Sequence, residues 1–392
     1  MKAHSILSIQ KALAELILSN SNLKTAKNNN ILFEDIDTIT KTKNAIKIQY
    51  KNGDCIIISI KKKGSPLKNF TSIDLFAGIG GIRLGFEQAF SSKIKTVFVS
   101  EWDNKAQETY TANYIDKMPI VGDITLIDPE NIPNFDILLA GFPCQPFSQA
   151  GLQKGFSDTR GTLFFNIEKI IEKKRPKVFF LENVKRLRTH DKGNTFKVIK
   201  EHLEALDYTF DYAILAAKDF GVPQHRERIY MVGFDKHYFN IPEDYHFEFP
   251  EPPKIPVKVG DILEKNVPEK YTLSDKLWAG TLRRKEEHLK KGNGFGYTLF
   301  NEDSPYTNTI SARYYKDGSE ALIEQKNKNP RKLTPRECAR LQGFPENFKI
   351  VVSDNAAYKQ FGNSVAVPVV KAIAKNIKNV LKELEVRHED NI

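Results

Sequence analysis

The chain of 392 residues, of which 40% are hydrophobic, is long enough for one large domain and one or two smaller units. Its apolar stretches stay below the ~18 residues of a membrane span, and residues 1–20 mix lysine and glutamate with apolar residues, so neither a membrane protein nor a signal peptide is expected. The net charge of +10 is uneven, because residues 1–70 carry 12 lysines against 5 acidic residues, whereas residues 71–250 carry 22 basic against 25 acidic residues.

The N-terminal unit, residues 1–66, is expected to be a small α+β extension. Apolar residues recur at helical spacing in residues 6–18, and residues 44–60 have the pattern of two strands around the turn Asn52-Gly53. The lysine-rich stretch that ends with Gly64-Ser65-Pro66 is typical of a domain boundary. We expect the lysine excess to contact a polyanion without reading its sequence, and a merely solvated lysine-rich surface is the alternative.

Strand and helix patterns alternate in residues 67–250. The expected strands are 72–76, 96–100, 135–140, 177–181, 212–215 and 228–234, and the expected helices are 81–90, 104–113, 163–173 and 194–206. Such alternation predicts an α/β fold with a mostly parallel sheet covered by helices on both faces.

The pattern changes at the proline-rich residues 249–256. After it we expect a smaller domain, residues 251–345, and between residues 251 and 330 only short pieces broken by turns. The last helix, Val367 to about Glu385, has no place in that domain, so residues 346–392 are expected to return to the first domain.

One cysteine, Cys144, directly follows the apolar run 135–140. The carboxyl end of a buried strand is where open α/β sheets place their chemistry, although a lone cysteine is more often an inert buried residue. Cys55 and Cys338 are far away in the sequence, and no Cys/His metal spacing occurs, so neither disulfides nor a metal site is expected. A reducing cytoplasm fits this usage and would keep the thiol free.

Six motifs together carry a family resemblance. They are Asp74–Gly81, Gly141–Pro146, Glu182-Asn183-Val184, Gln224–Arg228, Arg336–Pro345 and Gln360–Ser364. In this order they resemble the motifs of the DNA (cytosine-5) methyltransferases of bacterial restriction-modification systems, over about residues 70–378. The resemblance implies a Rossmann-like, S-adenosylmethionine-dependent methyltransferase domain in residues 67–250, a target-recognition domain in residues 251–345, and double-stranded DNA as the partner. We also expect a monomer that forms no stable complex with a cognate restriction endonuclease.

A glycine loop, residues 77–81, lies between an expected strand and helix, which is a nucleotide-binding geometry. Glu101 lies 20 residues past Gly81, where it is placed to accept hydrogen bonds from ribose hydroxyls. The loop alone leaves a dinucleotide and S-adenosylmethionine equally open, although Arg83 breaks the GxGxxG frame. The resemblance implies S-adenosylmethionine as the cofactor. The positions that match the family's cofactor-binding residues are Phe76, Gly78, Gly80, Glu101, Trp102, Asp123, Asn363 and Val365. For Trp102, packing in the core is the alternative.

The resemblance also implies covalent catalysis. The Cys144 thiolate would add to C6 of a cytosine rotated out of the duplex, which makes C5 nucleophilic. Glu182 would be the acid or hydrogen-bond donor at N3, which requires a pKa raised by burial, and a solvated side chain is the alternative. Arg226 and Arg228 fall on one face of an extended segment and are expected to face the pocket, and an exposed charged strand is the alternative.

Three residues are candidates for DNA binding. Phe295, between two glycines, would fill the gap that the flipped base leaves, and a flexible linker is the alternative. Thr309 matches the threonine of a Thr-Leu pair in the family's recognition region. Arg313 would read base edges, and a surface loop is the alternative.

Two other functions stay open. A tRNA cytosine-5 methyltransferase is disfavoured by the roughly 80 residues in place of a short recognition region, and a non-catalytic DNA-binding homologue by the intact motifs.

Overall fold

The structure is a computed structural model that describes residues 36–41, 45–50, 55–59, 68–116, 118–143, 163–294 and 296–391. Cys144, Phe295 and the helix expected over residues 6–18 lie outside these ranges. The chain forms two compact units, Met1–Pro66 and Leu67–Ile392. The further division of the second unit at residues 250 and 345 stays a prediction.

The first unit contains a three-stranded antiparallel sheet in the order β1-β2-β3. Its strands are β1 (Ile36–Lys41), β2 (Ala45–Tyr50) and β3 (Cys55–Ser59). The two strands expected on either side of Asn52-Gly53 are confirmed as β2 and β3. Strand β1 was not expected from the sequence.

The second unit is built on a seven-stranded sheet in the order β6-β5-β4-β7-β8-β11-β9. The five strands from β6 to β8 run parallel, and β11 is antiparallel to both β8 and β9. The predicted α/β fold with a mostly parallel sheet is therefore confirmed. The strands are β4 (Phe70–Leu75), β5 (Ile94–Ser100), β6 (Ile120–Val121), β7 (Ile137–Gly141), β8 (Val178–Val184), β9 (Asp211–Ala216) and β11 (Glu227–Phe234).

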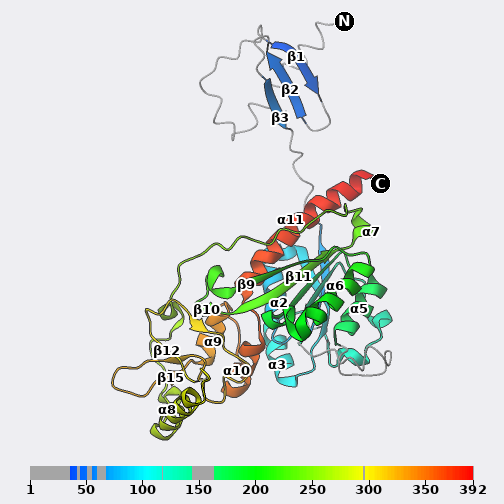
Figure 1. The fold of residues 1–392 in the computed structure, drawn as a ribbon. Coiled ribbons are helices and arrows are strands. Elements are labelled where there is room, and N and C mark those ends of the chain that lie inside the picture. The colour runs from blue at the N-terminus through cyan, green and yellow to red at the C-terminus, as the bar shows by residue number, and fades with distance from the viewer. Residues whose placement is uncertain are drawn as a thin grey trace. The chain divides into compact units, whose positions relative to one another are not determined.

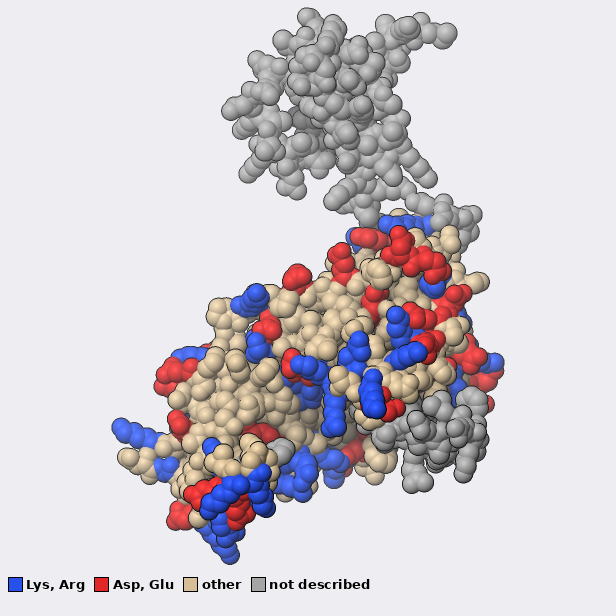
Figure 2. Space-filling view, viewed as in Figure 1, with Lys and Arg blue, Asp and Glu red and all other residues tan. Residues whose placement is uncertain are grey.

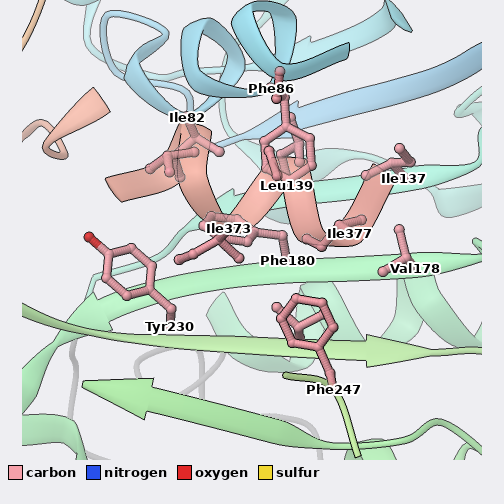
Figure 3. Packing of buried hydrophobic residues seen from close by; sticks show 14 of the residues in the cluster. Ile82, Phe86, Ile137, Leu139, Val178, Phe180, Tyr230, Phe247, Ile373 and Ile377 are labelled. Atoms are coloured by element: carbon pink, nitrogen blue, oxygen red, sulfur yellow. The ribbon is translucent and has the colours of Figure 1, made fainter. Parts of the chain in front are cut away.

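Helices cover both faces of this sheet. The helices α2 (Gly81–Phe90) and α11 (Val367–Asn391) pack on one face, and α5 (Leu163–Lys174) and α6 (Asn194–Ala205) pack on the other. The first four residues of β8 are all apolar because this strand is buried on both faces of the sheet. Phe180 belongs to the first core, and its neighbour Phe179 belongs to the second. Figure 3 shows the first core, with Phe86 of α2 and Ile373 and Ile377 of α11 over Leu139 and Phe180 of the sheet.

The last helix runs to Asn391, six residues past its expected end at Glu385, and packs against α2 as expected. Helices α3 (Asn104–Asn113) and α7 (Lys236–Phe239) complete this part of the fold. None of the helices in the described ranges is long and apolar enough to span a membrane.

The region after residue 250 consists mainly of short elements around a separate core (Figure 1). They are β12 (Leu299–Phe300), β13 (Thr307–Asn308), β14 (Leu322–Ile323), β15 (Arg331–Lys332), α9 (Pro335–Leu341) and α10 (Asp354–Asn363). Strand β13 pairs in parallel with β10 (Gln224–His225).

The expectation of short pieces alone was wrong at α8 (Asp275–Lys290), a helix of 16 residues. Of its side chains only Thr281 is buried, and eight of its 16 residues are charged, so its apolar residues Leu277, Trp278 and Leu282 do not stand out in the sequence. The Ser274 hydroxyl caps its N-terminus by accepting a hydrogen bond from the backbone N–H of Leu277.

The chain order of the strands fixes where a ligand can bind. From the central β4 the chain moves outward through β5 and β6 on one side, and then crosses to β7 and β8 on the other. The carboxyl ends of β4 and β7 are therefore the point where the connections diverge and leave a crevice. The glycine loop follows β4, and the segment that leads to Cys144 follows β7.

Candidate active site

The glycine loop turns sharply at three residues with positive φ: Phe76 (54°), Gly78 (56°) and Gly80 (81°). The two glycines serve different purposes. Apart from its chain neighbours, no atom of the described residues lies within 4 Å of the position that a Cβ at Gly78 would take. A Cβ at Gly80 would lie 2.3 Å from the ring of Tyr114, whose hydroxyl donates a hydrogen bond to the Gly80 carbonyl at 2.6 Å. Gly78 thus leaves room for a ligand, and Gly80 is required by packing.

Glu101 follows β5 and holds the glycine loop in place. Its carboxylate is buried and accepts hydrogen bonds from the backbone N–H groups of Gly78, at 2.7 Å, and Asp103, at 2.8 Å. Burial raises the pKa of Glu101. Its neighbour Trp102 is 80% exposed, which excludes the alternative that this tryptophan packs in the core.

Asp123 and the C-terminal return complete the predicted cofactor positions. Asp123 is exposed after β6, where its carboxylate accepts a hydrogen bond from the backbone N–H of Thr125. A Cβ at Gly81 would lie 2.6 Å from Ser364 Oγ and 3.0 Å from a methyl group of Val365, so the return segment packs directly on the glycine loop. Val365 is buried there, and Asn363 is exposed.

Glu182 lies near the end of β8, beside Gly141 of β7 in the parallel register. Its side chain is buried, which excludes the solvated alternative, and Oε1 lies 3.2 Å from Nε of Arg228. Burial raises the pKa of Glu182, while the positive charges of Arg228 and Arg226 act in the opposite direction. The carboxyl group therefore holds its proton to a higher pH than a solvated glutamate does.

Asn183 fixes the chain as it leaves β7. Its Nδ2 donates a buried hydrogen bond of 2.8 Å to the Phe142 carbonyl, and its Oδ1 accepts from the backbone N–H of Val184. Phe142 and Pro143 are the last described residues before Cys144. Sequence reasoning cited Asn183 as part of a motif and gave it no role, although an amide beside the motif glutamate was the available signal.

Arg226 and Arg228 both lie near Glu182 but bind different partners. The guanidinium of Arg226 is buried and donates hydrogen bonds to the carbonyls of Ile310 at 3.1 Å, Gly362 at 3.0 Å and Ser364 at 2.5 Å. Arg228 forms the ion pair with Glu182. Arg226 is buried and the side chain of Arg228 is 14% exposed, which excludes the exposed charged strand that the sequence left open. Arg226 contacts main-chain carbonyls of two distant segments.

The described candidates for DNA binding lie in the segment after β13, which Arg226 contacts through the Ile310 carbonyl. Thr309 is half-buried and donates a hydrogen bond of 2.7 Å to the His225 carbonyl, and Arg313 is exposed. Figure 2 shows lysine and arginine side chains mixed with acidic ones on α8, where Lys276, Arg283 and Lys290 are exposed.

Residues 70–379 match the family model of the C-5 cytosine-specific DNA methylases. The chain belongs to this family. It is similar to the type II methyltransferase M.SsoII of Shigella sonnei, at 64% identity over 80% of this chain and 81% of that protein, and to M.NlaX of Neisseria lactamica, at 60% identity over 81% of this chain and 99% of that protein. The resemblance seen in the sequence motifs is confirmed, and with it a restriction-modification cytosine methyltransferase.

Two solved structures show the same fold at lower identity. EhMeth, a methyltransferase of Entamoeba histolytica, superposes with a TM-score of 0.62 at 22% identity over 80% of this chain and 99% of that chain. A mutant of DNMT2 of Spodoptera frugiperda gives 0.64 at 20% identity over 81% of this chain and 100% of that chain. The likeness supports the Rossmann-like fold of this methylase.

Proposed function

We propose that this methylase transfers a methyl group from S-adenosylmethionine to C5 of a flipped-out cytosine within a specific duplex sequence, through a covalent adduct between Cys144 and C6. It would protect host DNA as a monomer, beside a cognate restriction endonuclease with which it forms no stable complex. The observation that carries this proposal is the buried Glu182–Arg228 pair, which lies beside the segment leading to Cys144 at the carboxyl ends of β7 and β8.

The residues around the glycine loop fit the cofactor. Gly78 leaves a cradle that a side chain would fill, Glu101 is fixed beside it, and the exposed ring of Trp102 offers a flat apolar face to an adenine. The eight predicted positions lie after β4, β5 and β6 and in the return segment that packs on the loop. S-adenosylmethionine would supply a methyl group on a positively charged sulfur, from which a nucleophilic carbon can take it.

The reaction needs a nucleophile and a proton donor. The Cys144 thiolate forms a bond to C6, and the electron pair of the C5–C6 bond then attacks the methyl carbon as the bond from that carbon to sulfur breaks. Glu182, whose pKa burial raises, donates a proton to N3 as negative charge develops there, and Arg228 orients the carboxyl group. Loss of the C5 proton to a base returns an electron pair to the ring and expels the thiolate, and the proton at N3 returns to the Glu182 carboxylate.

A duplex with 5-fluorocytosine at the methylated position tests the covalent step. The wild-type chain is expected to form an adduct that survives denaturation, because fluorine cannot leave C5 as a proton does. Cys144→Ser is expected to form no adduct and to lose at least ~100-fold in turnover, since the nucleophile is gone. Cys55→Ser, outside the residues that match the family, is the matched control and should behave as wild type. Full turnover by Cys144→Ser would refute the mechanism.

A methyl-transfer assay with S-adenosylmethionine that carries a tritiated methyl group, on duplex DNA and on tRNA, separates the alternatives. We expect transfer to duplex DNA alone. Transfer to tRNA alone would favour the RNA methyltransferase, and duplex binding without transfer would favour a non-catalytic homologue. Sequencing of plasmid DNA from an expressing host, by a method that reports 5-methylcytosine, identifies the target sequence.

A further inference from the structure

A buried polar hub, which we define as Gln224, Arg226 and Gln342, joins segments that are distant in the sequence. Each of the three side chains is buried. Gln224 and Arg226 lie at the entry to β11, residues 224–228, and Gln342 directly follows α9. They contact the recognition segment at residues 307–311 and the return segment at residues 361–365. The hub therefore joins residues of the catalytic sheet to both of the other segments.

Arg226 provides the shortest connection. One guanidinium nitrogen donates to the Ile310 carbonyl of the recognition segment, and the other donates to the Gly362 and Ser364 carbonyls of the return segment. A planar fork with several donors suits this task, whereas a lysine ammonium is a point charge on a flexible stem.

The two glutamines make a second, parallel connection. Gln224 Oε1 accepts from the backbone N–H of Ile310, and its Nε2 donates to Gln342 Oε1 at 3.2 Å. Gln342 Nε2 in turn donates to the Phe361 carbonyl at 2.7 Å. The recognition and return segments are thus joined twice through side chains of the hub.

The same two segments also touch directly. A Cβ at Gly362 would lie 2.2 Å from the Ser311 carbonyl oxygen. The backbones of the two segments therefore approach each other too closely at this point for any residue other than glycine. A displacement of one segment therefore displaces the other. On its far side the return segment packs on the glycine loop, where Ser364 and Val365 approach Gly81.

Stability alone is a poor reason for this arrangement. Burial lowers the pKa of Arg226 to about 9, which reflects the cost of holding a charge there, and Nε has no hydrogen-bond partner within the described part of the chain. An apolar side chain of similar volume would avoid this desolvation. The hub does join Ile310, next to the candidate DNA-binding residue Thr309, to Gly362 and Ser364, next to the candidate cofactor residues Asn363 and Val365.

We infer that Arg226 is a positioning residue that couples DNA binding at the recognition segment to cofactor binding at the return segment. The inference rests on the proposed function. Because Arg226 joins one segment to the other, a duplex that orders the recognition segment also orders the residues that hold the cofactor. By linkage the effect is reciprocal, so the cofactor strengthens duplex binding by the same factor.

The test measures a coupling factor. The Kd of a fluorescent duplex that contains the methylated sequence is determined without and with saturating S-adenosylhomocysteine, and the Kd of S-adenosylhomocysteine is determined without and with that duplex. Both ratios should give one factor, which we expect to be at least about fivefold for the wild-type chain. In Arg226→Lys, which keeps the charge and loses the fork, we expect the factor to fall to within about twofold of one.

Arg331→Lys is the matched control. Arg331 is equally buried, but its guanidinium binds Glu337 at 2.7 and 2.8 Å and the Lys332 carbonyl, all within one short segment. This variant is expected to lose stability and keep the wild-type factor. Gln342→Met interrupts the second connection and gives an independent reading if Arg226→Lys does not fold. A lowered factor is expected for it.

The outcomes separate this inference from the proposed function. Three results would each overturn the inference and leave the proposed function standing. The wild-type chain could bind both ligands with a coupling factor of one. Arg226→Lys or Gln342→Met could keep the full coupling factor, or the control Arg331→Lys could lose it as well. A wild-type chain that binds neither ligand would overturn both.

Discussion

The buried carboxyl group of Asp74 gives the sharpest prediction about stability. Asp74 lies on β4, just before the glycine loop, and is 1% exposed. Its Oδ2 accepts a hydrogen bond from the Tyr110 hydroxyl at 3.3 Å, and Oδ1 has no partner among the described residues. Burial raises the pKa of Asp74 to about 8, although Arg83 nearby acts against the shift.

The sign and the size of the effect follow from proton linkage. The unfolded chain releases this proton near a pH of about 4, whereas the native state keeps it to about pH 8, so the native state binds one proton more over that range. Stability conferred by the neutral carboxyl is therefore complete below about pH 4 and is lost as the pH rises toward 8. The loss is about 1.4 kcal/mol per pH unit, or about 2.7 kcal/mol between pH 5 and pH 7.

Asp74→Asn isolates this contribution, because the amide keeps an acceptor for Tyr110 and stays neutral at every pH. Urea denaturation at pH 5, 6, 7 and 8 is followed by tryptophan fluorescence. Both tryptophans of the chain, Trp102 and Trp278, lie in the unit Leu67–Ile392, so the signal reports on that unit. The variant should gain about 2.7 kcal/mol relative to wild type from pH 5 to pH 7. A difference that does not change with pH would refute the reasoning.

Three further predictions concern the catalytic acid, the contact between segments and the N-terminal unit. Glu182→Gln should lower the rate of tritium transfer at least ~100-fold, because the amide cannot give up a proton at N3; a wild-type rate would exclude the role. Gly362→Ala should lower the free energy of unfolding by roughly 1–3 kcal/mol in the urea assay, since its Cβ would meet Ser311. Gly280→Ala, on α8 with no described atom near its Cβ, should raise the free energy of unfolding by roughly 0.5–1 kcal/mol. Equal effects of the two substitutions would contradict the packing argument. Truncation before Leu67 should make the slope of log affinity for duplex against log salt shallower by about three and leave the target unchanged, and identical slopes would reject DNA contact by residues 1–66.

Much of the catalytic sheet could be predicted because its residues obey strong local rules. The helices α2 and α3 begin and end at the residues that the sequence indicated, Gly81–Phe90 and Asn104–Asn113. Strands buried on both faces read as apolar runs, as in Phe179 and Phe180, and such runs leave little choice of structure. The glycine loop and Glu182 were found from motifs, and the structure adds their burial and their contacts.

The helix α8 and the hub could not be predicted, for two different physical reasons. Helix α8 buries one side chain, Thr281, and half of its residues are charged, so charged residues dominate its sequence pattern. In the hub, Arg226 donates hydrogen bonds to carbonyls that are 84 to 138 residues away in the sequence, those of Ile310, Gly362 and Ser364. Any residue can supply a carbonyl, so the sequence carries no signal for such a partner.

The environment of Glu182 shows how the fold reconciles two conflicting demands on one carboxyl group. A proton donor at N3 must be neutral before the reaction, which burial favours, and it must also be held in one orientation, which the ion pair with Arg228 favours. Burial outweighs the two arginines, so the pKa of Glu182 stays raised while Arg228 remains 3.2 Å away. In the proposed mechanism, the carboxylate that forms when the proton moves toward N3 would already face the cation of Arg228. The ion pair would therefore stabilise the charge on Glu182 at the moment it appears.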